Sequence, residues 1–477
     1  MATALGSGIA FLDGSVVNVA LPAIRNDLGG GLTAQQWVVD GYLLTLSALL
    51  LLGGALGDRF GRRRVYVTGL VGFSLASLAC GLSPTADLLV VARLVQGVAG
   101  ALLVPGSLAL IDASIDPADR GRAVGVWAGL SGVSGALGPF VGGWLVDAAS
   151  WRWVFLINLP LAVAAVWTTM RFVPESRDAG AAGLDLYGAA LVVAGLSGSV
   201  YALIEVPAHG WSAASAAAVT IGVLGLGLLV PIERRQRHPM VPMQVFRSQQ
   251  FDGVQLTTLV VYAAISGGFF LVPLQLQETL HYSAQRAGLA LIPMTFITML
   301  LSPRMGALSQ RIGPRLPMTV GPMVIAAGVA LLSRVRPGSS YVSTVLPGVI
   351  VTGLGLSVTV APLTAAVFAS VPEEQAGVAS GVNNAVARVG GLLAVAVLPV
   401  AAGITTGTRG LGHGFERAMY ISAVIAAFGG VVAWLSVRTG THLRQHLHPA
   451  LTQACGDPSS RVDGHESLAD ATVDSLP

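Results

Sequence analysis

Apolar segments of membrane length follow one another along most of the chain and are separated by short polar breaks. We count about fourteen of them, each near the ~20 residues that a helix needs to cross a bilayer. Only 11% of the 477 residues are charged, whereas about 25% are charged in a typical soluble domain. The sequence therefore predicts an all-α integral membrane protein. The segments span residues 3–24, 36–57, 65–83, 88–112, 123–147, 153–171, 185–206, 213–231, 252–277, 285–307, 316–334, 342–370, 377–402 and 417–437.

Arginines concentrate in alternate loops between these segments, at residues 59–64, 120–122, 171–177, 234–247 and 311–315. The intervening loops hold only isolated arginines. Loops rich in basic residues stay on the cytoplasmic side of the membrane. We therefore expect a multi-pass protein of the plasma (inner) membrane with both termini in the cytoplasm. No basic region precedes the first segment, so we expect no cleavable signal peptide.

The chain also repeats itself, because residues 54–63 (GALGDRFGRR) recur in altered form at residues 306–315 (GALSQRIGPR). Each copy lies in the loop between the second and third segments of its half. Two parallel repeats with a substrate site between them are typical of transporters. We expect an N-terminal six-helix half (1–171), a cytoplasmic connector (172–184), two additional transmembrane helices (185–231), a second connector (232–251), a C-terminal six-helix half (252–437) and a disordered cytoplasmic tail (438–477).

Charged side chains inside the apolar segments are the first candidates for function. Asp13 lies in the first segment, where no neighbour in sequence neutralises it, so we expect it to face a water-filled cavity or a partner. Asp40, near the outer end of the second segment, is either solvated or faces the same cavity. Arg93, followed by Gln96, either extends its long side chain to the outer interface or has a functional role.

The loop at residues 54–64 has a distinctive pattern, G-x-x-x-D-R-x-G-R-R. Gly61 permits a tight turn, and Asp58 can cap a helix or pair with an arginine. The pattern resembles the signature loop of the major facilitator superfamily. That resemblance implies a cytoplasmic latch between the two halves, mainly in the first copy, because Gln310 replaces Asp58 in the second. The predicted latch residues are Gly54, Asp58, Arg59, Gly61, Arg62 and Arg63.

The fifth segment resembles the antiporter motif of the same superfamily, with Ser134 in place of a usual glycine. A proline there kinks the helix, and glycines admit the backbone of a neighbouring helix. Residues 11–22 (FLDGSVVNVALP) and 151–160 (WRWVFLINLP) resemble the fourteen-span drug:proton antiporter branch. The resemblance covers residues 1–437 and implies the major facilitator fold with two extra central helices. The motif residues of the fifth segment are Gly125, Gly138, Pro139, Gly142 and Gly143.

This resemblance implies a proton-coupled antiporter that exports small hydrophobic or cationic compounds, such as drugs or antibiotics, by alternating access. We expect burial to favour the neutral form of Asp13, so that a proton and the substrate compete for one carboxylate. Sequence RLVQG at residues 93–97 also resembles the superfamily and implies a role in proton movement. The residues expected to couple proton and substrate are Asp13, Asn18, Asp40, Arg93 and Gln96.

Polar groups also lie within the apolar segments of the C-terminal half. They serve either as bonds between helices or as the lining of a cavity. Arg388 lies deepest and requires a water-lined cavity or a carboxylate partner. Glu205 and Glu278, at outer helix ends, are expected to be solvated. The possible cavity groups are Gln275, Gln277, Asn383, Asn384 and Arg388.

Other chemistries have no motif in this sequence. No Walker loop is present, so ATP is not the expected energy source, and no His/Cys/carboxylate cluster has the spacing of a zinc site. Dispersed arginines do not form a nucleic-acid surface. We expect no enzyme and no catalytic, cofactor-binding or metal-binding residues, but a monomer whose partners are the substrate, protons and the lipid bilayer. The alternatives are an exporter of an endogenous metabolite (siderophore, amino acid or secondary metabolite), a symporter, a non-transporting receptor and a membrane-embedded enzyme.

Overall fold

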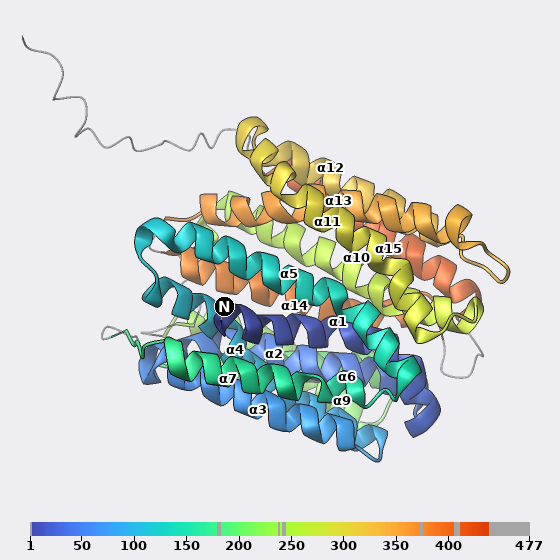
Figure 1. Cartoon of the computed structure of the whole chain (residues 1–477), viewed down its shortest axis with the longest axis horizontal. Coiled ribbons are helices and arrows are strands. Elements are labelled where there is room, and N and C mark those ends of the chain that lie inside the picture. The colour runs from blue at the N-terminus through green and yellow to red at the C-terminus, as the bar shows by residue number, and fades with distance from the viewer. Residues whose placement is uncertain are drawn as a thin grey trace, which may run out of the picture. The chain divides into compact units, whose positions relative to one another are not determined.

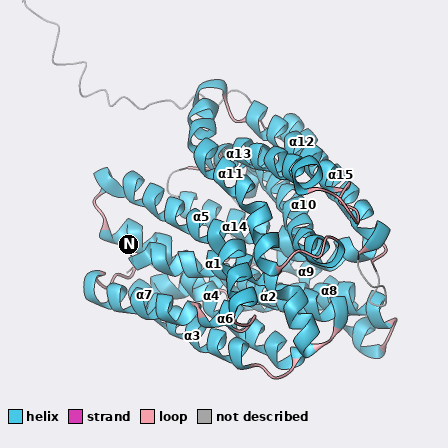
Figure 2. Ribbon diagram, turned by 45° about the vertical axis from the view of Figure 1, so that its right-hand side comes forward, coloured by secondary structure: helices cyan, strands magenta, loops and turns pink. Residues whose placement is uncertain are grey.

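The described part of this computed structural model comprises residues 2–178, 183–236, 239–240, 245–372, 375–404 and 411–437, and it contains helices but no strand (Figure 2). Fourteen helical segments are long and apolar enough to cross a membrane. The predicted number of spans and the all-α class are therefore confirmed. The predicted tail, residues 438–477, lies outside the described residues. The first group of helices is α1 (Ala2–Leu28), α2 (Gly31–Phe60), α3 (Arg62–Leu82), α4 (Ala86–Ser114), α5 (Pro117–Ala148), α6 (Trp153–Leu156) and α7 (Asn158–Phe172).

The remaining helices follow in the order of the predicted segments. Helices α1–α7 and α10–α15 each pack mainly within their own group, and the two groups lie side by side in Figure 1. We refer to them as the N-terminal and C-terminal groups. The later helices are α8 (Leu186–His209), α9 (Ala213–Glu233), η1 (Val245–Arg247), α10 (Gln249–Thr279), α11 (Ala284–Ile312), α12 (Arg315–Leu332), η2 (Tyr341–Val345), α13 (Leu346–Ala369), α14 (Ala376–Ala401) and α15 (Gly412–Ser436).

The sixth predicted span is interrupted, because α6 ends at Leu156 and α7 begins at Asn158. This break matters for the interior of the protein, since it places the amide side chain of Asn158 at the first turn of α7, where it is fully buried.

Helices α8 and α9 form a hairpin whose contact is made by small residues. A Cβ atom added at Gly198 of α8 would lie 2.4 Å from the carbonyl oxygen of Ala218 in α9, so the two backbones touch as small-residue packing in membranes allows. Leu196 of α8 packs with Leu44 of α2 and Leu392 of α14 in one buried cluster. The hairpin therefore rests on both groups of helices.

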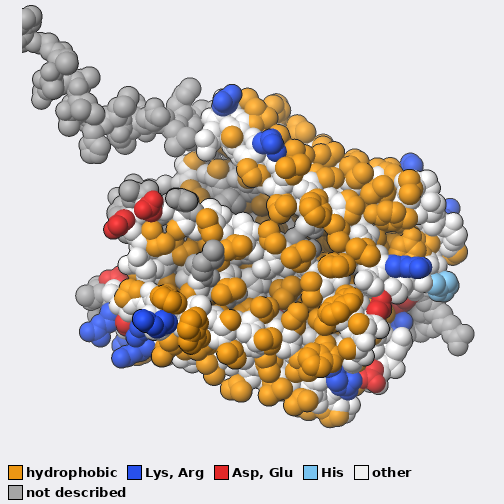
Figure 3. Space-filling model, viewed as in Figure 1, with side chains coloured by type: hydrophobic (Ala, Val, Ile, Leu, Met, Phe, Trp, Pro, Cys, Tyr) orange, Lys and Arg blue, Asp and Glu red, His pale blue; other side chains and the backbone are white. Residues whose placement is uncertain are grey.

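The two ends of the helix bundle differ in charge and in packing. We call the end where α1 begins and where Arg59 and Arg62 lie the basic end, and the end with the α1–α2 turn at Gly29 and Gly30 the turn end. Both glycines have positive φ, +77° and +86°, which glycine adopts without strain. Apolar side chains cover the middle of the face in Figure 3, and charged side chains gather at its edges. This distribution fits a multi-pass membrane protein.

At the turn end, α5 of the N-terminal group touches α11 of the C-terminal group through glycines. A Cβ added at Gly143 would lie 2.4 Å from the carbonyl oxygen of Ala284, and one added at Gly288 would lie 2.0 Å from that of Pro139. The carboxylate of Asp147 accepts hydrogen bonds from the backbone N–H groups of Ala284 (3.2 Å) and Gln285 (2.9 Å). A carboxylate of one group thus caps the N-terminus of a helix in the other, where the helix dipole favours negative charge.

Further bonds join the groups at the turn end. Arg25 of α1 forms an ion pair with Glu278 of α10 at 2.6 Å, and the Gln277 side chain donates to the carbonyl oxygen of Val19 at 3.0 Å. The side chain of Glu278 is only 10% exposed, so the expectation that it is solvated is wrong, because an arginine from the other group covers it. Glu205 also has a partner, since it accepts a hydrogen bond from the Trp37 indole at 2.8 Å.

Toward the basic end, the same face of α5 loses its contact with α11. Gly125, Gly129 and Gly132 share a helical face with Gly143, yet a Cβ added at any of the first three would meet no described atom within 4 Å. The two groups are therefore closed against each other at the turn end and separate toward the basic end along α5.

The Asp147 cap provides a test of this closure. We expect Asp147→Ala to weaken the closed state by about 0.5–2 kcal/mol, the range for losing a helix N-cap. Spin labels at Ala149 and Arg286 in a Cys455→Ser background should then show a larger share of long distances across the turn end.

Asp147→Asn is the comparison variant, because it keeps one acceptor oxygen of the two, and we expect it to weaken the closed state less than Asp147→Ala does. An unchanged distance distribution in Asp147→Ala would show that the cap does not stabilise the closure.

Candidate functional site

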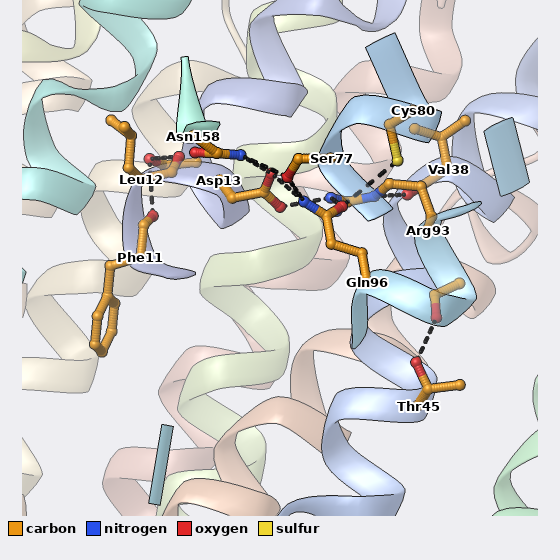
Figure 4. A network of polar contacts seen from close by, with 12 residues as sticks. Phe11, Leu12, Asp13, Val38, Thr45, Ser77, Cys80, Arg93, Gln96 and Asn158 are labelled. Carbon is orange, nitrogen blue, oxygen red and sulfur yellow. Dashed lines mark hydrogen bonds and ion pairs between the residues drawn. The ribbon is translucent and has the colours of Figure 1, made fainter. Parts of the chain in front are cut away.

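Asp13 lies at the centre of a buried polar network in the N-terminal group (Figure 4). Its side chain is 0% exposed and forms an ion pair with Arg93 of α4, from Nη1 to Oδ2 at 2.5 Å. The Gln96 and Asn158 amides donate to its other oxygen, Oδ1, at 3.0 and 2.9 Å. The carboxylate thus has a counter-charge and two neutral donors.

Ser77 of α3 holds the two amides in place. Its hydroxyl oxygen accepts from Gln96 at 2.7 Å and from Asn158 at 3.2 Å. The Gln96 carbonyl oxygen in turn accepts from Arg93 Nη1 at 2.7 Å. The network therefore connects α1, α3, α4 and α7. A change in the charge of Asp13 would alter hydrogen bonds that involve each of these helices.

Arg93 is enclosed by further contacts. Its Nε donates to the carbonyl oxygen of Val38 at 2.9 Å, and its guanidinium carbon lies 4.4 Å from the centre of the Tyr42 ring, a cation–π geometry. The side chain is 1% exposed. The alternative that Arg93 extends to the outer interface is therefore wrong, because an internal carboxylate compensates its charge.

A cavity of about 170 Å³ lies between the two groups of helices. Two of its lining residues, Gly14 and Ser15, directly follow Asp13 in the sequence. Among the described residues, no charged side chain lines the cavity. The Oδ1 atom of Asn18 is buried and has no hydrogen-bond partner among the described residues. Asn18 thus belongs to the cavity and not to the Asp13 network. The lining residues are Gly14, Ser15, Asn18 and Val19 of α1, Gly135 and Pro139 of α5, Phe269 and Pro273 of α10, and Gly288, Leu291, Met294 and Thr295 of α11.

Asp40 lies apart from both features. It is fully buried, and neither of its oxygens has a hydrogen-bond partner in the described part of the chain. One helical turn away on α2, the Gln36 side chain donates to the carbonyl oxygen of Val395 in α14 at 2.8 Å. Asp40 is therefore not the solvated interfacial acid that its position in the sequence allowed, because α2 turns it into the protein interior.

The polar groups of the C-terminal half have separate positions. Gln275 donates to the carbonyl oxygen of Val335 at 3.0 Å, and Asn383 donates to Gln255 (3.1 Å) and Thr258 (2.8 Å) of α10. These two bond helices of the same group, whereas Gln277 bonds across the groups as described above. Asn384 and Arg388 remain partly accessible in the middle of α14.

Comparison with known proteins assigns the family. The family model described as Major Facilitator Superfamily matches residues 3–395. The chain belongs to this superfamily. The solved D-xylose–proton symporter has the same fold, with a TM-score of 0.64 at 15% identity over 92% of this chain and 97% of that one. The major facilitator fold predicted from sequence is thus confirmed, and the chain is one of a family of membrane transporters of small molecules.

Several curated relatives carry names that refer to resistance. The multidrug resistance protein Stp of Mycobacterium tuberculosis is 34% identical over 83% of this chain and 74% of its own length. The puromycin resistance protein pur8 of Streptomyces alboniger is 35% identical over 91% and 90%. A methylenomycin A resistance protein of Streptomyces coelicolor is 36% identical over 91% of each chain. These relatives agree with the predicted drug:proton antiporter branch.

The superfamily's signature loop makes its described contacts within the N-terminal group. Asp58 accepts from Arg62 Nε at 2.8 Å, and Glu175, just after α7, accepts from the backbone N–H of Arg63 at 3.0 Å. Gly61 has a φ of +111°, which explains the glycine. The predicted latch between the two halves is therefore not formed by these contacts, since their partners all belong to the N-terminal group. Gly54 packs against Pro105 of α4, and Arg59 lies over the ring of Phe60.

The antiporter motif positions α5 against two neighbours. A Cβ at Gly138 would lie 1.9 Å from Ser15 Oγ, and one at Gly142 would lie 2.4 Å from Val16 Cγ2, both on α1. Gly143 and Pro139 face α11 as described above. The glycines therefore let α5 touch α1 and α11 at once, while Gly125 takes no part in either contact.

The sequence patterns did not select Asn158, Ser77 and Tyr42, which contact the Asp13–Arg93 pair or its amide partners. Asn158 is an isolated amide in the apolar run after Trp153, so the criterion that selected Gln275 could have selected it. Ser77 and Tyr42 carry no such signal, because serine and tyrosine are common in membrane helices and only the packing brings them to Gln96 and Arg93.

The ion pair makes a prediction about stability. Arg93→Gln leaves a buried carboxylate without its counter-charge, so we expect it to lower the free energy of unfolding by about 3–5 kcal/mol. Unfolding in mixed micelles would measure this. The double variant Asp13→Asn/Arg93→Gln should recover much of the loss, because no charge remains unpaired.

The exposed ion pair between Arg152 and Asp27, also at 2.6 Å, supplies the control. We expect Arg152→Gln to cost only about 0–1 kcal/mol, as is usual for surface pairs. Equal losses in Arg93→Gln and the double variant would contradict the assignment of the loss to the unpaired carboxylate.

Proposed function

We propose that this protein exports small, largely hydrophobic antibiotic-like compounds in exchange for protons. The observation that carries the proposal is the buried carboxylate of Asp13, which pairs with Arg93 and lies on α1, the helix that also supplies part of the cavity lining, beginning at Gly14. The names of the relatives Stp, pur8 and the methylenomycin A resistance protein support a role in drug efflux. The receptor, enzyme and endogenous-metabolite alternatives gain no support from these comparisons.

Alternating access is the proposed transport cycle. If the arginine-rich loops face the cytoplasm, the basic end is the inner end and both termini are cytoplasmic. The conformation described above, in which bonds of Asp147, Arg25 and Glu278 close the turn end, is then the inward-facing state. In the outward-facing arrangement these bonds break, and the signature loop around Asp58 contacts the C-terminal group.

Proton coupling is assigned to Asp13. Protonation removes its charge, so the ion pair with Arg93 is lost and the amides of Gln96 and Asn158 are freed. Gly14 and Ser15, the next residues on α1, line the cavity, so a shift of α1 on protonation changes the substrate site. Proton and substrate exclude each other through this helix rather than by contact with the same oxygen atoms.

The cavity supports a hydrophobic substrate. It has no charged lining residue and a single unpartnered amide oxygen, that of Asn18, in the described part of the chain. An apolar compound with one hydrogen-bond donor fits such a site. The proton gradient supplies the energy, no cofactor takes part, and a single chain suffices as the transporting unit.

Asp13→Asn tests the coupling. In a host without its own efflux pumps, we expect the wild-type protein to raise tolerance to puromycin or methylenomycin A, the compounds in the names of two relatives, and a protonophore to abolish the gain. Asp13→Asn should lose at least about 90% of the gain, because the amide cannot carry the proton.

Asp27→Asn is the matched control, since Asp27 is an exposed carboxylate on the same helix. Folded protein in the membrane is quantified for each variant. Full proton-driven tolerance in Asp13→Asn would refute the proposed role of this residue.

A further inference from the structure

The guanidinium group of Arg388 lies in the interior of the protein, and no carboxylate in the described part of the chain forms an ion pair with it. It lies in the middle of α14, deep in the helix bundle, and its Nε is buried without a hydrogen-bond partner among the described residues. No ion pair within the described ranges includes it. Part of the side chain nevertheless remains accessible, so it borders an internal space and is not packed on every side.

A buried cation is costly unless a charge or several acceptors compensate it. The Tyr42 and Tyr262 phenols lie near enough to Arg388 to interact with it electrostatically, and phenols are neutral at pH 7. Asp13 already pairs with Arg93, and Asp40 makes no hydrogen bond to Arg388. The described interior thus leaves one positive charge uncompensated.

The position of Arg388 on α14 directs it toward the space between the two groups of helices. Gly381, on nearly the same helical face, lies against Leu51 of α2, with 3.0 Å from an added Cβ to the leucine side chain. Gly390, on another face, lies against the carbonyl oxygen of Leu259 in α10. Arg388 therefore lies on the side of α14 that faces α2 of the N-terminal group, and Asn384 precedes it by one turn on the same side, as the i, i+4 spacing requires.

We propose that Arg388 binds an acidic group, a carboxylate, on the exported compound. A guanidinium offers two parallel N–H donors that match a carboxylate in geometry and charge, and Asn384 adds a neutral donor and acceptor one turn away. This inference rests on the proposed export function and names its substrate class as hydrophobic organic acids. The expectation of cationic substrates came from the family resemblance, and the Asp13 carboxylate, which could attract a cation, is already paired with Arg93.

Matched acids and amides test the proposal with purified protein in lipid nanodiscs. The probes are benzoate, 1-naphthoate and anthracene-9-carboxylate, each beside its primary amide, with binding followed by tryptophan fluorescence. We expect the wild-type protein to bind at least one acid about tenfold or more tightly than its amide, since a charge-assisted bond is stronger than a neutral one. Arg388→Gln should abolish this preference, and Arg388→Lys should keep part of it.

Arg336→Gln is the control, because it makes the same chemical change at a residue whose side chain is 67% exposed. The proposal is wrong if the wild-type protein binds no acid of the series, binds the amides equally well, or keeps its preference in Arg388→Gln. Proton-driven tolerance to neutral compounds is measured on the same variants. Its persistence in Arg388→Gln would leave the export function intact, so the two proposals fail separately.

Discussion

The ion pair between Asp13 and Arg93 is the interaction on which the arrangement of the N-terminal group depends. Each charge alone would be too costly in the interior of a membrane protein, so the two are stable there only together. The second oxygen of Asp13 draws in Gln96 and Asn158, and Ser77 fixes both amides. One carboxylate thereby sets the relative positions of α1, α3, α4 and α7. Protonation of this carboxylate would change the contacts that join these four helices.

Glycines decide how the two groups of helices meet. In lipid there is little hydrophobic force between helices, so close packing of their backbones is needed to hold them together. At the turn end the backbones come this close at Gly143 and Gly288, which lie against carbonyl oxygens of the facing helix. Polar bonds reinforce this junction through Asp147, Arg25 and Gln277. These bonds can break individually. The junction therefore holds the turn end closed in this structure and can still open in an alternating-access cycle.

The interior also holds polar groups that the described fold leaves unsatisfied. Asn18, Asp40 and Arg388 each have buried atoms without a partner among the described residues, and each lies on a helix at the boundary between the two groups. A stable fold avoids such groups unless function requires them. Other unpartnered buried atoms, such as the hydroxyls of Thr169 and Ser422, lie elsewhere, but these three charged or amide groups at the boundary are consistent with substrate recognition there.

The sequence by itself determined the membrane class, the number of spans and the superfamily, because apolar length and loop motifs are local properties of the chain. It also selected Asp13, Arg93 and Gln96 as candidates, since a charge or amide in an apolar segment is visible without a structure. Only the tertiary structure decided that Asp13 pairs with Arg93, that Asn158 completes the site, and that Asp40 is buried and not solvated. Sequence patterns show how deep a residue lies along its helix, but they do not show which neighbour it faces. That depends on how the helices pack, and it is the packing that turned isolated charges into a site.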